Sequence, residues 1–340
     1  MSVFDRSVLD LDPAGEVHEI SVRLRDIVQK RLRCRGVVVA VSGGIDSSVT
    51  CALAVRALGP GRVFALLMPE RHSDPDSTRR GLLLADALGV ARVVEDVAPA
   101  LAALGCYRRY DAAVRRVMPN YGEGWRSKLV LPGDVLDSDR VNVSQLVVRA
   151  PGGAESTVRL TADVYLELVA TTNFKQRVRK TLEYFHADRL RYAVAGTPNR
   201  LEYDQGFFVK NGDGSADVKP IAHLYKTQVY ALARHLDLPE EICGAEPTTD
   251  TFSLPQTQTE FYFALPYREM DLLLWARSHA VPAADAAAAL ALQPVQVERV
   301  YRDIERKRAV AAYLHLPPVL VKPVDPGPPW ERQDTPGVGE

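Results

Sequence analysis

The chain has 340 residues, of which 46% are hydrophobic, and its 42 lysine and arginine side chains nearly balance 43 aspartates and glutamates. This length and apolar content predict a chain that folds by itself around an ample core. The formal net charge of -1 provides no general attraction to nucleic acid or to an anionic membrane surface, so neither is expected as a partner.

Two features bear on the compartment of the protein. Four widely spaced cysteines without a CxxC pair predict neither a disulfide framework nor a zinc site. The first residues, MSVFDRSVLDLDPAGE, carry acids where a signal peptide has a basic and then an apolar run, and no segment approaches the length of a membrane span. A soluble, cytoplasmic protein is therefore expected.

Alternating helix and strand patterns fill the first hundred residues. Apolar side chains recur on one helical face over residues 16–33, and residues 37–41 (VVVAV) are apolar throughout, as is typical of a strand buried on both faces of a parallel sheet. The next elements are expected as a helix at 47–58, a strand at 62–69, a helix at 74–88 and a strand at 91–97. This alternation predicts an α/β fold, a doubly wound parallel sheet with flanking helices.

The pattern changes near residue 107. Residues 107–165 are rich in polar and turn residues and contain two β-type runs joined by APGGAES, so we expect an insertion with a β-hairpin. The remaining elements are expected as a helix at 173–187, a buried strand at 190–197, an alanine-rich helical segment at 278–316 and a loose Pro/Gly-rich tail at 323–340. Residues 1–322 are expected to form a single domain.

The strand at 37–41 runs directly into SGGIDSS and then into a helix. Such a junction presents backbone N–H groups and the positive end of a helix dipole to one small volume, which suits phosphate. Gly43 and Gly44 allow close backbone approach, the serines of the motif add hydroxyl donors, and Asp46 could hold a magnesium ion. A tight turn that caps a helix explains a bare glycine pair equally well, but the strand and helix around it favour a nucleotide site.

Longer motifs carry a family resemblance. SGGIDSS resembles the SGGxDS loop of the ATP pyrophosphatases, which adenylate a substrate and release pyrophosphate. The block GTPNRLEYDQGFFVKNGDGSADVKPIAHLYKTQVYALARHL, from Gly196, resembles the GTxNxxE...GxxTKxGDxxxDxxPIxxLxKxQV block of the NAD synthetases. NFKQRVRK, from Asn173, and EPTTDTFSLPQTQTEFYFALPYREMD are similar to further parts of that family's pattern. The resemblance implies an adenine nucleotide alpha hydrolase-like fold.

The resemblance also implies an ATP-dependent amide ligase that acts on deamido-NAD. The nicotinate carboxylate would attack the α-phosphate of ATP, pyrophosphate would leave, and ammonia would then displace AMP to give NAD. These steps require positioning and charge neutralisation without a covalent enzyme nucleophile. No histidine falls in a recognisable dyad, so none is assigned to catalysis.

The resemblance assigns roles to individual residues. The implied ATP contacts are Ala40, Val41, Ser42, Gly43, Gly44, Ile45, Asp46, Ser47, Thr197, Lys226 and Thr248. The implied dinucleotide contacts are Arg177, Lys210, Asp217, Arg306 and Lys307. Asp46 and Glu202 would hold Mg²⁺, and the implied catalytic residues are Lys226, which would stabilise the departing pyrophosphate, and Asp46.

The chain departs from the family pattern in places that touch the acid substrate. The family's TKYGD is VKNGD here, with Val209 and Asn211 changed; its DE is Thr259-Glu260; and its His-Lys pair is Arg306-Lys307. The predicted insertion also enters near the side of the sheet where substrate should bind. A related ligase of specialised metabolism, which adenylates a different acid or uses a different amine, is therefore a second hypothesis.

Two further classes of protein are less favoured. A tRNA-modifying ATP pyrophosphatase fits poorly with the near-zero charge and the lack of paired cysteines. A nucleotide-binding protein without catalysis fits poorly with the joint presence of Asp46, Glu202 and Lys226.

The resemblance bears on partners as well. About 36 residues precede the first strand, too few for the glutaminase domain of some NAD synthetases, so the nitrogen is expected from free ammonia, a separate partner or another amine. A homodimer with substrate sites shared between subunits is also implied. The amphipathic first helix could serve that interface or pack on its own sheet.

Overall fold

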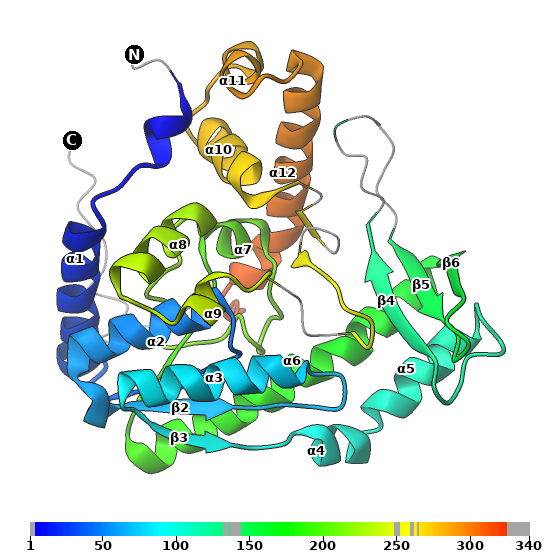
Figure 1. Ribbon diagram of the computed structural model, residues 1–340, viewed down its shortest axis with the longest axis horizontal. Helices are drawn as coiled ribbons and strands as arrows, with labels where there is room; N and C mark the ends of the chain where they lie inside the picture. Colours follow the sequence, from blue (N-terminus) through cyan, green and yellow to red (C-terminus); the bar gives the residue numbers. More distant parts are fainter. Residues whose placement is uncertain are drawn as a thin grey trace.

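Four parallel strands form the main sheet of the computed structural model (Figure 1). The structure describes residues 4–131, 136, 144–247, 252–258, 262–263 and 265–324. The strands are β1 (Val37–Ala40), β2 (Val63–Leu67), β3 (Ala91–Val94) and β7 (Ala193–Ala195), in the order β3-β2-β1-β7. β1 pairs in parallel with both of its neighbours, with Val37 opposite Val63 on one side and Ala193 on the other.

Helices cover both faces of this sheet. They are α1 (Pro13–Asp26), which continues as a π-helical turn (Ile27–Arg31), α2 (Ile45–Leu58), α3 (Pro75–Leu88), α4 (Ala98–Ala103), α6 (Ala162–Leu190) and α8 (Lys226–His235). Val37 and Val39 of β1 pack in one core with side chains of α1, α2 and α8, whereas Val38 packs in another with side chains of α4 and α6. The predicted doubly wound α/β fold is confirmed, and β1 is apolar throughout because both of its faces are buried.

The polar stretch after residue 107 contains more regular structure than its sequence predicts. α5 (Cys106–Arg115) is followed by an antiparallel sheet of β4 (Arg126–Val130), β5 (Gln145–Arg149) and β6 (Glu155–Arg159). The hairpin of β5 and β6 matches the prediction, but α5 and β4 are not predicted from the sequence. α5 and β4 each bury only one side, as Ser127 and Leu129 show in β4. The polar residues on the other side hide the apolar periodicity that would predict a helix or a strand.

α6 is also longer than its sequence indicates. It begins at Ala162, well before the predicted start at residue 173, because Val164, Leu168 and Thr171 place a buried stripe on this first part of the helix. Val164 and Leu168 pack in one core with side chains of α5 and of the antiparallel sheet. α6 therefore joins the two sheets.

Shorter helices connect the sheet to a helical subdomain at the C-terminal end. The connecting helices are α7 (Arg200–Gln205) and α9 (Glu240–Cys243), and the subdomain contains α10 (Tyr267–Ser278), α11 (Ala283–Leu290) and α12 (Pro294–His315). The helical segment predicted over 278–316 is thus two helices, not one. Ala291 ends α11 in the left-handed region, and Pro294 begins α12. Phe4 and Leu9 pack in the same core as these helices.

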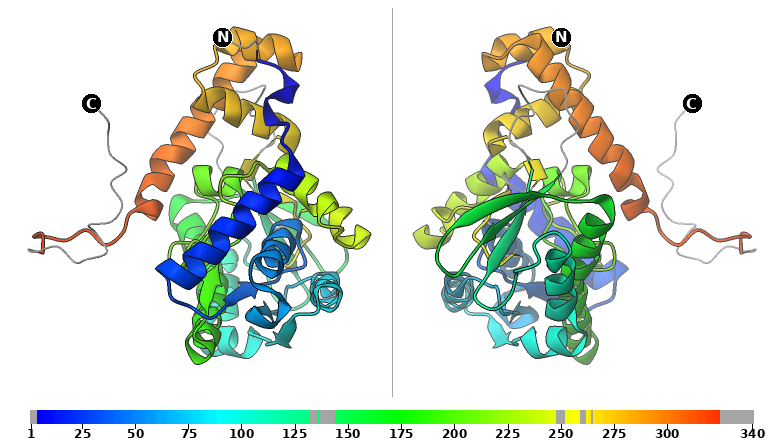
Figure 2. Two further views of the ribbon diagram at one scale, coloured as in Figure 1. Left: turned by 90° about the vertical axis from the view of Figure 1, so that its left-hand side faces the viewer. Right: turned by 90° about the vertical axis from the view of Figure 1, so that its right-hand side faces the viewer.

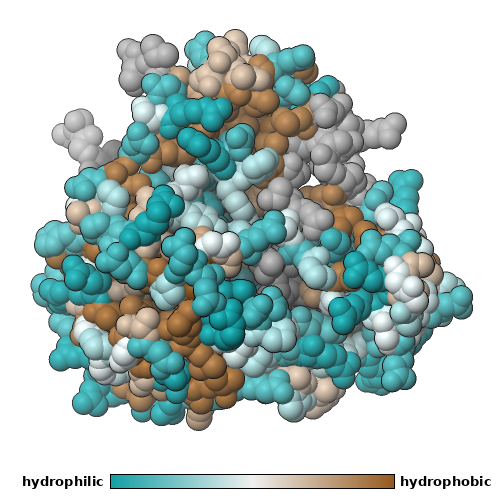
Figure 3. Space-filling view, in the orientation of Figure 1, coloured by the Kyte–Doolittle hydropathy of each residue, from teal (hydrophilic) through white to brown (hydrophobic). Residues whose placement is uncertain are grey.

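Polar side chains cover most of the face in Figure 3, and apolar ones gather in several patches, most clearly at the lower left and at the top. After α12, residues 316–324 lead away from the body of the protein (Figure 2), and Val321 is 99% exposed. Among the residues that the structure describes, no helix combines the length and the apolar character needed to cross a membrane.

Gly43 has a conformation and a packing environment that exclude a side chain. Its φ is +77°, and a Cβ atom there would lie 2.2 Å from the carbonyl oxygen of Ser77. We expect Gly43→Ala to lower the free energy of unfolding by about 3 kcal/mol, through backbone strain and overpacking. Urea unfolding would measure this.

Gly44→Ala is the matched control. Gly44 has a φ of −86°, and a Cβ atom there would meet only the Ser42 hydroxyl at 3.4 Å. Gly44→Ala should therefore lower the free energy of unfolding by less than about 1 kcal/mol. Equal losses in the two variants would show that the close approach of Gly43 to Ser77 is not what constrains the loop.

Candidate active site

The segment between β1 and α2 is held by its own serines. Ser47 Oγ accepts a hydrogen bond from the backbone N–H of Ser42 at 3.2 Å and donates to the carbonyl of Gly44 at 3.0 Å. Ser48 Oγ donates to the same carbonyl at 2.8 Å. These hydroxyls fix the loop at the start of α2, where the helix dipole favours an anion.

A buried charged group stands beside this loop. Lys226, the first residue of α8, is 1% exposed, and its Nζ forms an ion pair with Asp46 Oδ2. Asn199 links the two acids of the group: its Nδ2 donates to Asp46 at 3.0 Å and its backbone N–H to Glu202 at 3.1 Å. Gln258 Nε2 donates to the other oxygen of Glu202 at 3.3 Å. Residues predicted from separate motifs therefore lie together.

The charges in this group strongly influence one another. Burial, and then the negative charge of Asp46, raise the pKa of Glu202 to about 8. Burial lowers the pKa of Lys226, but Asp46 and Glu202 outweigh that effect and hold it above its ordinary value. One amine thus serves two acids, and further positive charge is needed before both acids are easily ionised.

A cavity of about 580 Å³ opens in front of the loop. The predicted ATP contacts that line it are Ala40, Val41, Ser42, Gly43, Gly44, Ile45, Asp46, Ser47, Thr197 and Lys226. Glu202 and Lys307 line it as well. Thr248 lies outside the described residues, as do Thr259 and Glu260.

Four predicted substrate contacts do not line this cavity. Lys210 donates to the carbonyls of Tyr313 and Leu316, at the end of α12, at 2.8 and 3.0 Å. Arg177 Nε donates to the carbonyl of Lys210 at 3.3 Å. Asp217 accepts from the backbone N–H of Val194 in β7 at 2.7 Å.

Arg306 is the fourth, and it is exposed on α12. Its neighbour Lys307 points inward, donating to the carbonyl of Tyr262 at 2.7 Å and pairing with Asp303 at 2.8 Å. The structure therefore brings Lys307 to the cavity and leaves the remaining four predicted substrate contacts outside it within one chain.

Comparison with known proteins identifies the family. A family model described as NAD synthase matches residues 16–118 and 142–311. The chain belongs to the NAD synthase family. Residues 119–141, which the match leaves out, lie inside the predicted insertion.

Individual relatives agree with this assignment, and a solved structure shares the fold. A protein of Rhizobium meliloti strain 1021 named NH(3)-dependent NAD(+) synthetase is 56% identical over 323 residues, or 95% of this chain and 96% of its own. One of the same name from Mesorhizobium japonicum is 55% identical over 92% of this chain and 98% of its own. The NH3-dependent NAD synthetase from Campylobacter jejuni has the same fold, with a TM-score of 0.58 at 21% identity over 92% of this chain and all of its own.

This NAD synthase-family chain has a polar region in its cavity that the sequence does not reveal. Lys180 Nζ lies 2.7 Å from Glu183 on α6, and both side chains line the cavity together with Asp213 and Arg179. Burial raises the pKa of Glu183 and of Asp213. Asp213 lies within VKNGD, which could have signalled it, but Lys180 and Glu183 look like ordinary surface charges in a helical sequence.

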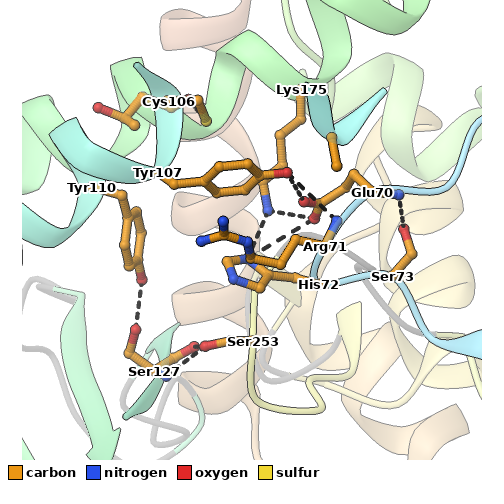
Figure 4. Close-up of polar contacts among 12 residues, drawn as sticks. Glu70, Arg71, His72, Ser73, Cys106, Tyr107, Tyr110, Ser127, Lys175 and Ser253 are labelled. Carbon is orange, nitrogen blue, oxygen red and sulfur yellow. Dashed lines mark hydrogen bonds and ion pairs between the residues drawn. The ribbon is translucent and has the colours of Figure 1, made fainter. Parts of the chain in front are cut away.

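A second polar cluster lies where the segment after β2 meets α5 and α6 (Figure 4). Glu70 accepts hydrogen bonds from Lys175 Nζ at 2.7 Å and from the Tyr107 hydroxyl at 2.8 Å. Lys175 also donates to Nδ1 of His72 at 3.2 Å. Met68 and Ser73, at the two ends of this segment, line the cavity, so the cluster supports one of its walls.

His72 in this cluster should make stability depend on pH. Burial, and then the charge of Lys175, lower its pKa from 6.5 to about 4. Between these values the unfolded chain binds a proton that the folded chain does not, so stability should fall as pH falls from 6.5 to 4. The loss should reach at most about 3 kcal/mol.

Urea unfolding at pH 7 and pH 5 would test this. His72→Gln keeps an acceptor for Lys175 but does not titrate, so this variant should lose less stability than the wild type at the lower pH. His18→Gln, at an exposed position, should follow the wild type. If His72→Gln and the wild type lose stability equally, His72 does not cause the dependence.

Proposed function

We propose that this chain is an ammonia-dependent NAD⁺ synthetase. It adenylates the nicotinate carboxylate of deamido-NAD with ATP, releases pyrophosphate, and transfers ammonia to give NAD and AMP. The observation that carries the proposal is the group formed by Asp46, Glu202 and Lys226. All three side chains line one cavity, beside the loop from Ala40 to Ser47, which we call the phosphate loop. The names of relatives that match more than nine tenths of their own length support the choice of acid and amine.

In this proposal, ATP lies with its phosphates on the loop from Ala40 to Ser47. The backbone N–H groups at the start of α2 and the helix dipole stabilise negative charge there. Lys226 is buried and aimed at the loop, so its amine stabilises the charge that develops on departing pyrophosphate. Thr197 lines the same cavity, and Thr248, which lies outside the described residues, stays a predicted ATP contact.

Asp46 and Glu202 are the residues that would hold Mg²⁺. They fit this ion because two carboxylates gathered around Asn199 offer hard oxygen ligands. Burial and the charge of Asp46 raise the pKa of Glu202, and a bound cation would offset both effects. Among the described residues, no three acidic, histidine or cysteine side chains gather as a ligand set, so phosphate and water oxygens would complete the coordination. When bound, the ion supplies charge that offsets the phosphate oxygens.

Deamido-NAD occupies the remaining part of the cavity, toward Lys307 and the polar side chains of α6. Arg177, Lys210, Asp217 and Arg306 lie outside this cavity in one chain, so their proposed roles require a movement or a second copy. A homodimer with shared sites is part of the proposal for that reason. A cytoplasmic location and a single domain over residues 1–322 are proposed with it.

The proposal predicts that Asp46 is essential for both products. With ATP, magnesium, ammonium and deamido-NAD, the protein should form pyrophosphate and NAD in equal amounts. A coupled phosphate assay would measure pyrophosphate, and mass spectrometry would measure NAD. Asp46→Asn should slow both by about 100- to 1000-fold, because it removes the charge that positions Lys226 and the ion. Asp26→Ala, which removes an exposed acid paired with Lys30, should keep full activity.

Each outcome separates this function from a related one. Pyrophosphate that depends on deamido-NAD but is formed without NAD would mean that the chain adenylates this acid and uses a different amine. ATP binding with no turnover of deamido-NAD would exclude it as the substrate. Full activity in folded Asp46→Asn would contradict the role given to the buried group.

A further inference from the structure

The first turns of α3 pack directly on the phosphate loop. The space that a side chain at Gly43 would need is filled by the carbonyl of Ser77, and the Cβ of Arg80 lies 3.2 Å from the same point. Ser77, Thr78 and Arg80 all line the cavity. α3 therefore forms part of the wall beside the phosphate loop, although no motif in its sequence indicates this.

Arg80 is held against the loop by weak contacts. Its Nε donates to the carbonyl of Gly43 at 3.3 Å, and one terminal nitrogen, Nη2, donates to Ser77 Oγ at 3.3 Å. The nearest carboxylate oxygen among the described residues, on Asp74, is 4.0 Å away, beyond hydrogen-bond distance. The Arg80 side chain is 15% exposed and that of Asp74 is 50% exposed, so within the described part of the chain Arg80 is a partly buried positive charge whose ion pair with a carboxylate is long and open to solvent.

The lysine amines in the cavity differ from Arg80, because each forms a close ion pair with a carboxylate. Lys226 pairs with Asp46, Lys180 pairs with Glu183, and Lys307 pairs with Asp303. Their charges are offset within the protein. A guanidinium that rests on a backbone carbonyl retains its capacity to bind an anion, and its planar fork matches phosphate oxygens.

We propose that Arg80 is a further ATP-binding residue that contacts the triphosphate beside Gly43. The inference rests on the ATP binding proposed above and adds a residue from α3, a helix outside the motifs that define the loop. Arg80 supplies positive charge to the loop from α3, whereas Lys226 supplies it from α8. Arg80 therefore determines ATP affinity more than affinity for the acid substrate.

The neighbouring Arg79 provides a matched control. It lies on the same turn of α3 with a side chain that is 54% exposed, and it pairs with Asp76 and Glu241. It does not line the cavity. Arg79→Ala thus removes the same charge from the same helix without touching the proposed site.

Calorimetric titration with ATP in the presence of magnesium, and with adenosine, would test the inference. Arg80→Ala should weaken ATP binding by about 10- to 100-fold, the effect of one hydrogen-bonded charge pair, and leave adenosine binding unchanged. Arg80→Lys should recover part of the loss, because it keeps the charge but not the fork. Arg79→Ala should bind both ligands as the wild type does.

Several results would overturn the inference. If Arg80→Ala binds ATP as tightly as the wild type does, the inference is wrong. If the variant loses affinity for ATP and adenosine equally, the role of Arg80 is structural and the inference is also wrong. If thermal unfolding shows that Arg80→Ala is unstable, Arg80→Gln, which retains a donor for Gly43, takes its place and should show the same selective loss for ATP. Failure of the wild type to bind ATP at all would instead refute the proposed function.

Discussion

The contact between Lys226 and Asp46 joins parts of the chain that are 180 positions apart. Asp46 lies in the first turn of α2, Lys226 begins α8, and Asp271 of α10 accepts hydrogen bonds from the backbone N–H groups of Lys226 and Thr227. The sheet and the C-terminal helices thus meet at the start of α8, whose first side chain is the buried amine of Lys226. A buried ion pair is weak evidence for stability, because desolvation offsets much of its attraction. Its value here is that it fixes the geometry of charges around the phosphate loop.

The parts of the fold that could be predicted are those whose burial leaves a simple pattern. β1 is apolar at each position because helices cover both of its faces, and SGGIDSS marks the turn into α2. β4 and α5 each bury one face only, and the polar residues of the exposed face make the segment resemble a loop. The start of α6 escapes prediction for the same reason: its buried stripe of Val164, Leu168 and Thr171 is narrow.

The candidate site divides in the same way. Asp46, Glu202 and Lys226 belong to motifs whose spacing is unusual, so their meeting could be predicted from resemblance, although their hydrogen bonds through Asn199 could not. Arg79 and Arg80 show the limit. They are identical neighbours on one helix, and only the packing of α3 on Gly43 turns Arg80 toward the cavity while Arg79 faces solvent. A helical sequence does not reveal which of two adjacent charges is buried.

Several of the charged side chains that line the cavity are paired with one another. Asp46 with Lys226, Glu183 with Lys180, and Glu70 with Lys175 behind the wall each satisfy a buried charge within the protein. Removing one member would leave the buried charge of its partner less well compensated, so these pairs constrain the wall to one arrangement. A ligand with several phosphates would need more positive charge than these paired amines supply, and backbone N–H groups, a bound cation, and guanidinium groups that rest on carbonyl oxygens would provide it. Lys226, which is paired with Asp46, and Arg80, which rests on the carbonyl of Gly43, are therefore the two side chains that we propose supply positive charge at the phosphate loop.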